Sequence, residues 1–281
     1  MMRNTPACFA EAFTRRRAAA CAALVALTLP LLAQSAQPRP AAPVDLSGSW
    51  GYAVANSFSP TGTAQDAGTP ADGVPYQPWA LALMKSRKTM TGPNATFNTR
   101  NSATLETTDT TDPLEQCTPN GIPRILTWPA KFKFLQAPDV VYILYEYGPY
   151  WRPVWMNRQH PPADELDSTF FGHAIGRYEG NDTFIVDTVG FNDKTWLDDV
   201  GRPHTDKLHL IERYRRVDQG RLEVTLTIDD AGAYTSTFTF GPRTVLARTT
   251  DFGAALWTCT IENNKEFFKD IAAPTLTAPA K

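Results

Sequence analysis

The sequence predicts an all-β protein, an antiparallel barrel or sandwich formed by a single domain. After residue 130, short segments rich in β-branched and aromatic residues follow one another without helical patterns between them. Turn sequences such as residues 179–182 (EGND) separate these segments. Within residues 221–228 apolar and polar side chains alternate, as in a strand with one buried face. We expect the sheet to close into a barrel, because long strands lined by tyrosine and tryptophan would otherwise leave exposed edges that aggregate.

The chain begins with a leader typical of exported proteins. An arginine triplet, residues 15–17, precedes an uncharged apolar run, residues 18–33, that is too short to span a bilayer. Small residues at positions 33 and 35 offer a cleavage site, so we expect residues 1–36 to be a signal peptide. The triplet leaves both the general secretory and the twin-arginine route open. The mature protein is therefore expected in the periplasm or outside the cell, without a transmembrane segment.

The mature chain divides by composition into a linker, one domain and a tail. Residues 37–44 are rich in proline and alanine and form the linker, and residues 270–281 form a flexible tail. The domain between them, residues 45–269, shows neither an internal repeat nor a second domain.

The domain is expected to open with one strand and two long excursions. Gly48 and Trp50 lie on the first strand, and one short helix begins at Pro78, between excursions at residues 56–73 and 91–112. The further strands are expected within residues 131–136, 139–148, 150–157, 172–180, 182–190, 206–217, 221–230, 233–241, 244–250 and 255–263.

Composition and missing motifs exclude several classes of function. The formal net charge is −2, and removal of the leader takes away four arginines and one glutamate, so the mature chain is acidic and has no nucleic-acid partner by this criterion. Walker and GxGxxG motifs are absent from the sequence, as is a GxSxG nucleophile elbow. We expect neither a nucleotide nor another cofactor.

The four histidines all fall between residues 160 and 209, which suggests an acid–base site. His204 and His209 are the catalytic candidates, with Asp187 or Glu212 as the carboxylate that orients them. Arg213 is the candidate that stabilises an oxyanion. The alternative is that these residues form ion pairs of the barrel wall and that His173 is structural.

Strand geometry limits which of these side chains can meet. Side chains alternate along a strand, so His209 and Arg213 share one face while Glu212 and Tyr214 share the other. His209 and Glu212 therefore cannot both point into the barrel from a regular strand.

Two further kinds of site are open. If a metal is bound at all, its ligands would be His160, His204 and His209, although their spacing is not specific for a metal. Alternatively, aromatic rings and arginines could stack a ligand ring and pair an acidic group, with Arg152, Arg158 or Arg213 as the anion clamp. The ligand-binding candidates are Tyr145, Arg152, Trp155, Arg158, His160, Trp196 and Tyr214.

Several motifs resemble a known group of proteins. The sequences PYQPWA, CTPNGIPR, VDTVGFNDKTWLD and GRPHTDKLHLIERYRR resemble, in this order, a group of exported bacterial proteins without an assigned activity. That resemblance covers roughly residues 45–269 and implies a calycin-like, lipocalin-type barrel. The two cysteines outside the leader, Cys117 and Cys259, are most simply one disulfide in an oxidising compartment, and they lie where the group carries its two cysteines.

Together these observations suggest an exported β-barrel that binds a small molecule. We expect an acid–base enzyme, a lyase, isomerase or hydrolase, acting on a hydrophobic, aromatic or sugar-like ligand. The alternatives are a noncatalytic ligand carrier or sensor of the lipocalin type, and a metalloprotein with histidine ligands.

Overall fold

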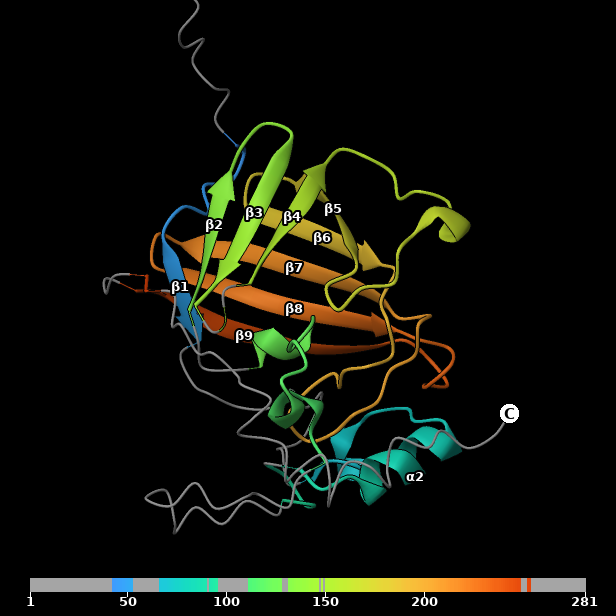
Figure 1. Cartoon of the computed structure of the whole chain (residues 1–281). Coiled ribbons are helices and arrows are strands. Elements are labelled where there is room, and N and C mark those ends of the chain that lie inside the picture. The colour runs from blue at the N-terminus through green and yellow to red at the C-terminus, as the bar shows by residue number, and fades with distance from the viewer. Residues whose placement is uncertain are drawn as a thin grey trace, which may run out of the picture. The chain divides into compact units, whose positions relative to one another are not determined.

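The computed structural model describes residues 42–52, 66–89, 91–95, 111–127, 131–146, 148, 150–248 and 252–253. All of them belong to one compact unit, Ala42–Lys281. Nine strands in this part of the chain form a closed barrel, and its α-helix is α2, Pro78–Ser86 (Figure 1). The predicted barrel and short helix are confirmed. The leader, the start of the linker, most of the two expected excursions, the whole of the last expected strand (residues 255–263) and the tail lie outside the described residues.

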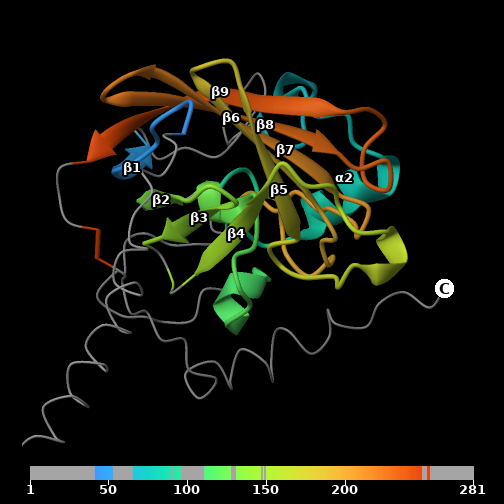
Figure 2. The same cartoon turned by 90° about the horizontal axis from the view of Figure 1, so that it is seen from above.

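The strands follow one another around the barrel in chain order, and β9 closes it against β1. Figure 2 shows β2–β4 on one side and β7–β9 on the other. The strands are β1 (Ser49–Tyr52), β2 (Phe132–Gln136), β3 (Val140–Tyr145), β4 (Trp151–Met156), β5 (His173–Glu179), β6 (Thr183–Val189), β7 (His209–Asp218), β8 (Arg221–Asp229) and β9 (Phe238–Arg248).

One pair of neighbouring strands departs from the antiparallel prediction. Strands β4 and β5 are parallel, with Val154 opposite Ala174, whereas the other neighbours are antiparallel. The reason is the connection, residues 157–172, which returns the chain to the end of the barrel at which β4 began. This connection contains the short 3-10 helix η6, Ala163–Glu165, and it brings His160 to the outer wall.

The C-terminal part of the barrel contains one long strand where two were expected. The segments expected as strands at 233–241 and 244–250 form one long strand, β9, which begins at Phe238. Gly241 has a φ of +99°, and a Cβ there would lie 2.6 Å from the carbonyl oxygen of Val224. Glycine therefore allows a bulge at this point, where the β8–β9 register shifts, and the strand continues instead of ending.

The barrel interior is filled by alternate side chains of the strands. On β8 these are Leu222, Val224, Leu226 and Ile228, all completely buried. Aromatic rings pack across the interior, and those of Phe134 and Tyr214 meet edge to face at 5.2 Å. The predicted alternation of side chains along this strand is confirmed, and the structure decides which face turns inward: Leu210, Glu212 and Tyr214 are buried while the residues between them are partly exposed.

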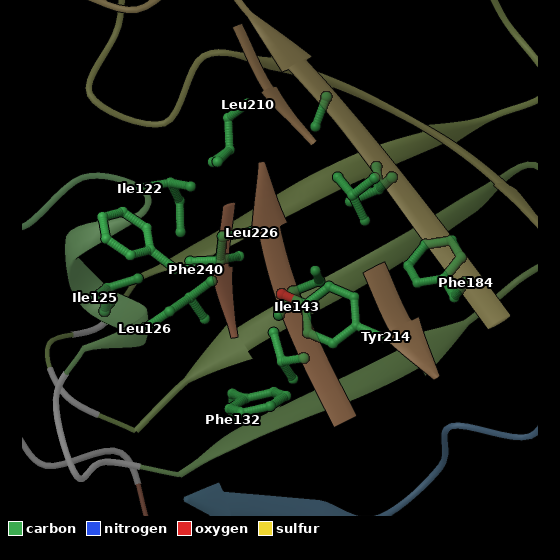
Figure 3. Packing of buried hydrophobic residues seen from close by; sticks show 14 of the residues in the cluster. Ile122, Ile125, Leu126, Phe132, Ile143, Phe184, Leu210, Tyr214, Leu226 and Phe240 are labelled. Atoms are coloured by element: carbon green, nitrogen blue, oxygen red, sulfur yellow. The ribbon is translucent and has the colours of Figure 1, made fainter. Parts of the chain in front are cut away.

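Residues 111–127 pack against one end of this core. Ile122, Ile125 and Leu126 belong to the same hydrophobic cluster as Leu226 and Phe240, and Figure 3 shows them side by side. The segment contains the 3-10 helices η4, Pro113–Gln116, and η5, Arg124–Leu126. Within this segment, the two Nη atoms of the buried Arg124 donate to the two carboxylate oxygens of Asp112, and this bidentate ion pair stabilises its conformation.

The segment around helix α2 is joined to the loop between β6 and β7 through buried polar and apolar contacts. Arg202 is completely buried and donates to the carboxylates of Asp72 and Asp198 and, at 3.0 Å, to the hydroxyl of Tyr76. Met84 of the helix packs in a small cluster with Val200. Both interactions connect the residues around α2 to the loop between β6 and β7.

Candidate acid–base site

The outer wall of strands β5, β6 and β7 carries two histidines and an aspartate. His173, Asp187 and His209 are partly exposed, and their neighbours along each strand, Ala174, Thr188 and Leu210, are buried. All three side chains therefore point away from the barrel interior. Adjacent β-strands lie about 4.8 Å apart, which brings these side chains within reach of one another.

His160 completes the set from the connection between β4 and β5. Its Nε2 lies 3.1 Å from Oδ1 of Asp187, and its Nδ1 lies 2.9 Å from Nδ1 of His173. Nε2 of His209 lies 2.8 Å from the same Oδ1 of Asp187. The four residues form a linear hydrogen-bonded chain in the order His173, His160, Asp187, His209, which we call the histidine chain.

The hydrogen bonds determine where the protons are. A carboxylate only accepts, so Nε2 of His160 and Nε2 of His209 each carry a hydrogen. When the three imidazoles are neutral, Nδ1 of His160 is unprotonated and accepts the hydrogen on Nδ1 of His173. Nε2 of His173 is then unprotonated, which makes it a base at one end of the chain.

The two ends of the chain have opposite electrostatic environments. The hydrogen bond to Asp187 raises the pKa of His209 above its ordinary value of about 6.5, and the carboxylate of Asp229 adds to this. Partial burial lowers the pKa of His173, and the neighbouring His160 and Arg158 lower it further. The pKa of Asp187 is lowered mainly by the hydrogen bond from His209, so it stays ionised. His173 is therefore suited to accept a proton and His209 to donate one.

His204, predicted beside His209, lies apart from the chain. It is only 4% exposed, its Nδ1 donates to the carbonyl oxygen of Thr205 at 3.2 Å, and its Nε2 accepts from the hydroxyl of Thr195 at 2.9 Å. Burial lowers its pKa. Both ring nitrogens are used in holding the loop before β7, so the structure places His204 as a structural residue.

Glu212 and Arg213 lie on opposite faces of β7. Glu212 is buried in the barrel, where it accepts from Nη2 of Arg152 at 2.6 and 2.5 Å and from the hydroxyl of Tyr214 at 2.6 Å. Tyr145 is buried beside this group, and burial raises its pKa. Arg213 points outward and forms an ion pair with Glu179 of β5. Neither Glu212 nor Arg213 contacts the histidine chain.

The remaining ligand-binding candidates also lie in different parts of the structure, some near the histidine chain and one away from it. Arg158 lies over the ring of Trp155, with its guanidinium carbon 4.7 Å from the ring centroid, and both are at the end of β4 from which His160 follows. Trp196 is buried far along the chain from them and contacts the guanidinium groups of Arg87 and Arg124. Trp196 is therefore a packing residue of the loop.

The aromatic hairpin of β3 and β4 also forms an apolar hollow on the outside of the barrel. It is lined by Leu135, Tyr142, Leu144 and Trp151, and Trp151 is 60% exposed. The rings of Tyr142 and Trp151 meet edge to face at 5.7 Å. Nothing polar lines this hollow, so it offers no group for chemistry.

The predicted metal ligands do not form one set. His160 and His209 both contact Asp187, whereas His204 bonds to two threonines. The histidine chain is linear, with the ring of His160 between its neighbours, so its nitrogens do not converge on a point. Across the described ranges, no group of three or more histidine, cysteine, aspartate or glutamate residues could hold a metal ion. The disulfide stays a prediction, because Cys259 lies outside the described residues.

His173 was not among the predicted catalytic or ligand-binding residues. The hairpin of β5 and β6 places His173 opposite Val189, which puts it diagonal to Asp187 on the neighbouring strand. The short turn at residues 180–182 was visible in the sequence, and the register that it implies could have paired His173 with Asp187. The contribution of His160 follows from the parallel β4–β5 connection and had no local signal.

Comparison of the sequence with protein-family models finds no match, and comparison with curated proteins finds none either. In the described part of the chain, no helix has the length and apolar character needed to cross a membrane.

Proposed function

We propose that this protein is an acid–base enzyme of a calycin-like barrel, in which the histidine chain transfers protons to and from a small organic substrate. The observation that carries the proposal is the linear chain itself, whose ends have pKa values shifted in opposite directions. Groups whose environments separate their pKa values in this way are suited to work as an acid–base pair. His173 is the general base and His209 the general acid.

The chain can spread the charge that proton transfer creates. When Nε2 of His173 accepts a proton, its Nδ1 hydrogen can move to Nδ1 of His160, 2.9 Å away. The positive charge then lies on His160, whose Nε2 donates to the ionised Asp187. Asp187 therefore orients His160 and His209 and stabilises an imidazolium, as the carboxylate of a catalytic triad does.

The surroundings favour a substrate with an apolar part. Ile175 and Ile211 pair on either side of Asp187 and are partly exposed, as is Val189 between the two histidine-bearing strands. These side chains form an apolar surface next to the histidine chain on the outer wall. The proposed reactions are those that proton transfer drives on such a molecule, namely isomerisation, elimination or hydrolysis. Export to the periplasm, or secretion, is part of the proposal and rests on the leader sequence.

Solvent deuterium exchange into ketones and hydrolysis of p-nitrophenyl acetate, measured as kcat/KM against pH, test the proposal. We expect activity between the two histidine pKa values: it rises with pH as His173 loses its proton, below about 6.5, and falls as His209 loses its proton, above about 6.5. H173N should abolish the low-pH limb and H209Q the high-pH limb, each with a loss of roughly 10²–10⁴-fold.

His204 provides the comparison variant. H204Q should lower stability without removing either limb, because the hydrogen bonds of the His204 ring go to Thr195 and Thr205 and not to the histidine chain. A folded H173N variant that keeps full activity and both limbs of the pH profile contradicts the proposal. If folded H204Q loses a limb of the pH profile, His204 and not the histidine chain is the catalytic group.

A noncatalytic carrier is the second candidate, and it rests on the barrel interior. Nε and Nη1 of Arg152 and the hydroxyl of Tyr145 are buried beside one another, and none of them makes a hydrogen bond of standard geometry within the described residues. A ligand with an oxygen acceptor could satisfy them. Native mass spectrometry would favour the carrier if a retained small molecule is lost in R152M while the histidine variants keep it.

A further inference from the structure

Three arginines were candidates for binding an anion, and the structure separates them. Arg152 is buried in an ion pair with Glu212, and Arg213 is paired with Glu179. Arg158 is exposed, and among the described residues no carboxylate lies within ion-pair distance of it. Of the three, Arg158 is therefore the one whose charge is available to a ligand.

Trp155 fixes this available charge in place. The guanidinium of Arg158 lies over the indole ring at 4.7 Å, so its face is used by the aromatic contact. The N–H groups of a stacked guanidinium point outward from its edge and remain free to donate to an oxygen. A donor held in this way needs little rearrangement when charge develops next to it.

Arg158 is also near the basic end of the histidine chain. It lies two residues before His160, whose Nδ1 contacts His173. Trp155 pairs with Ile175 across β4 and β5, two residues from His173 on the same outward face. The positive charge of Arg158 is felt at His173, where it helps to lower the pKa. The cation and the base therefore lie on one part of the wall.

We propose that the substrate is a carbonyl compound with an acidic α-hydrogen and an apolar body, and that Arg158 binds its carbonyl oxygen. This inference rests on the proposed acid–base function and adds the substrate class and the residue that holds the developing oxyanion. Arg158 thereby becomes a catalytic residue, and Trp155 a positioning residue that acts through it.

The proposed step is enolisation. The α C–H bond breaks and an N–H bond forms at Nε2 of His173, while the electron pair of the C–H bond forms the C=C bond of an enolate. The carbonyl π pair moves to oxygen, where the guanidinium of Arg158 stabilises the negative charge. His209 returns a proton to a carbon of the conjugated system, so the product is an isomer or the exchanged substrate. Nothing is oxidised or reduced.

The test uses phenylacetone in D2O as the probe and follows α-deuterium incorporation by mass spectrometry. We expect the wild-type protein to catalyse the exchange and R158M to lower kcat/KM by about 10²–10³-fold. The low-pH limb of the remaining R158M activity should also move to higher pH, because removing a positive charge raises the pKa of His173. R177M, which removes another exposed arginine of the β5 wall, is the matched control and should keep wild-type exchange.

The outcomes separate this inference from the proposed function. Wild-type exchange that R158M leaves unchanged overturns the role of Arg158 and keeps the histidine chain. Absence of exchange, together with pH-dependent ester hydrolysis that H173N removes, overturns the carbonyl substrate class and keeps acid–base catalysis. Absence of both activities in the folded wild-type protein overturns the two proposals together.

Discussion

The ion pair inside the barrel provides the strongest test of how the interior is stabilised. A single nitrogen of Arg152, Nη2, donates to both oxygens of Glu212, and both side chains are almost fully buried. Tyr214 donates a further bond to Glu212. Nε and Nη1 of Arg152 make no hydrogen bond of standard geometry among the described residues, and Tyr145 lies beside the guanidinium, so Glu212 is the carboxylate on which its charge depends.

The two single variants should therefore differ in stability. E212L leaves a buried guanidinium without its carboxylate, and a guanidinium cannot give up its proton, so we expect a loss of about 3–5 kcal/mol in the free energy of unfolding. At about 2–4 °C per kcal/mol, this lowers Tm by roughly 6–20 °C. R152M should cost less, because Glu212 keeps the bond from Tyr214 and a carboxylate can be neutralised by a proton.

A double-mutant cycle measures the coupling. R152M/E212L contains no unpaired charge, so its loss should be smaller than the sum of the two single losses. Urea denaturation at pH 7, followed by tryptophan fluorescence, gives the four free energies of unfolding. The exposed outer-wall pair of Arg213 and Glu179 serves as the control, and R213M should change stability by no more than about 1 kcal/mol. An E212L variant as stable as the wild type, or additive single losses, would refute the reasoning.

Two further predictions concern stability. R202M leaves the carboxylates of Asp72 and Asp198 buried without their cation, so it should lose about 3–5 kcal/mol in urea denaturation. R215M, at an exposed pair with Glu223, should keep the urea midpoint of the wild type, and equal losses in the two variants would contradict this. The raised pKa of His209 means that its bond to Asp187 stabilises the fold below about pH 6.5 and that this stabilisation is lost as pH rises through the folded-state pKa. The difference in unfolding free energy between wild type and H209Q should thus be larger at pH 6 than at pH 9, and a difference independent of pH would count against the contact.

Local pattern predicted the strands and the alternation of side chains between their two faces. The alternation in residues 221–228 and 208–214 follows from the two-residue period of a strand, which needs no knowledge of the partner strand. The parallel β4–β5 pair was not predicted, because the direction of a strand depends on where a long connection returns the chain. The joining of two expected segments into β9 depended on whether Gly241 makes a turn or a bulge, and glycine permits both.

Part of the candidate site was likewise predictable from the sequence, and part depended on the tertiary structure. The sequence by itself determined that His209 and Glu212 lie on opposite faces of one strand, and that the histidines fall within one stretch of the chain. Only the tertiary structure decided that Asp187 joins His160 to His209, that His204 is buried against Thr195, and that Arg152 turns inward to Glu212. The physical reason is that alternation along a strand is a local property of the backbone, whereas contacts between side chains depend on the register of neighbouring strands and on the path of the loops.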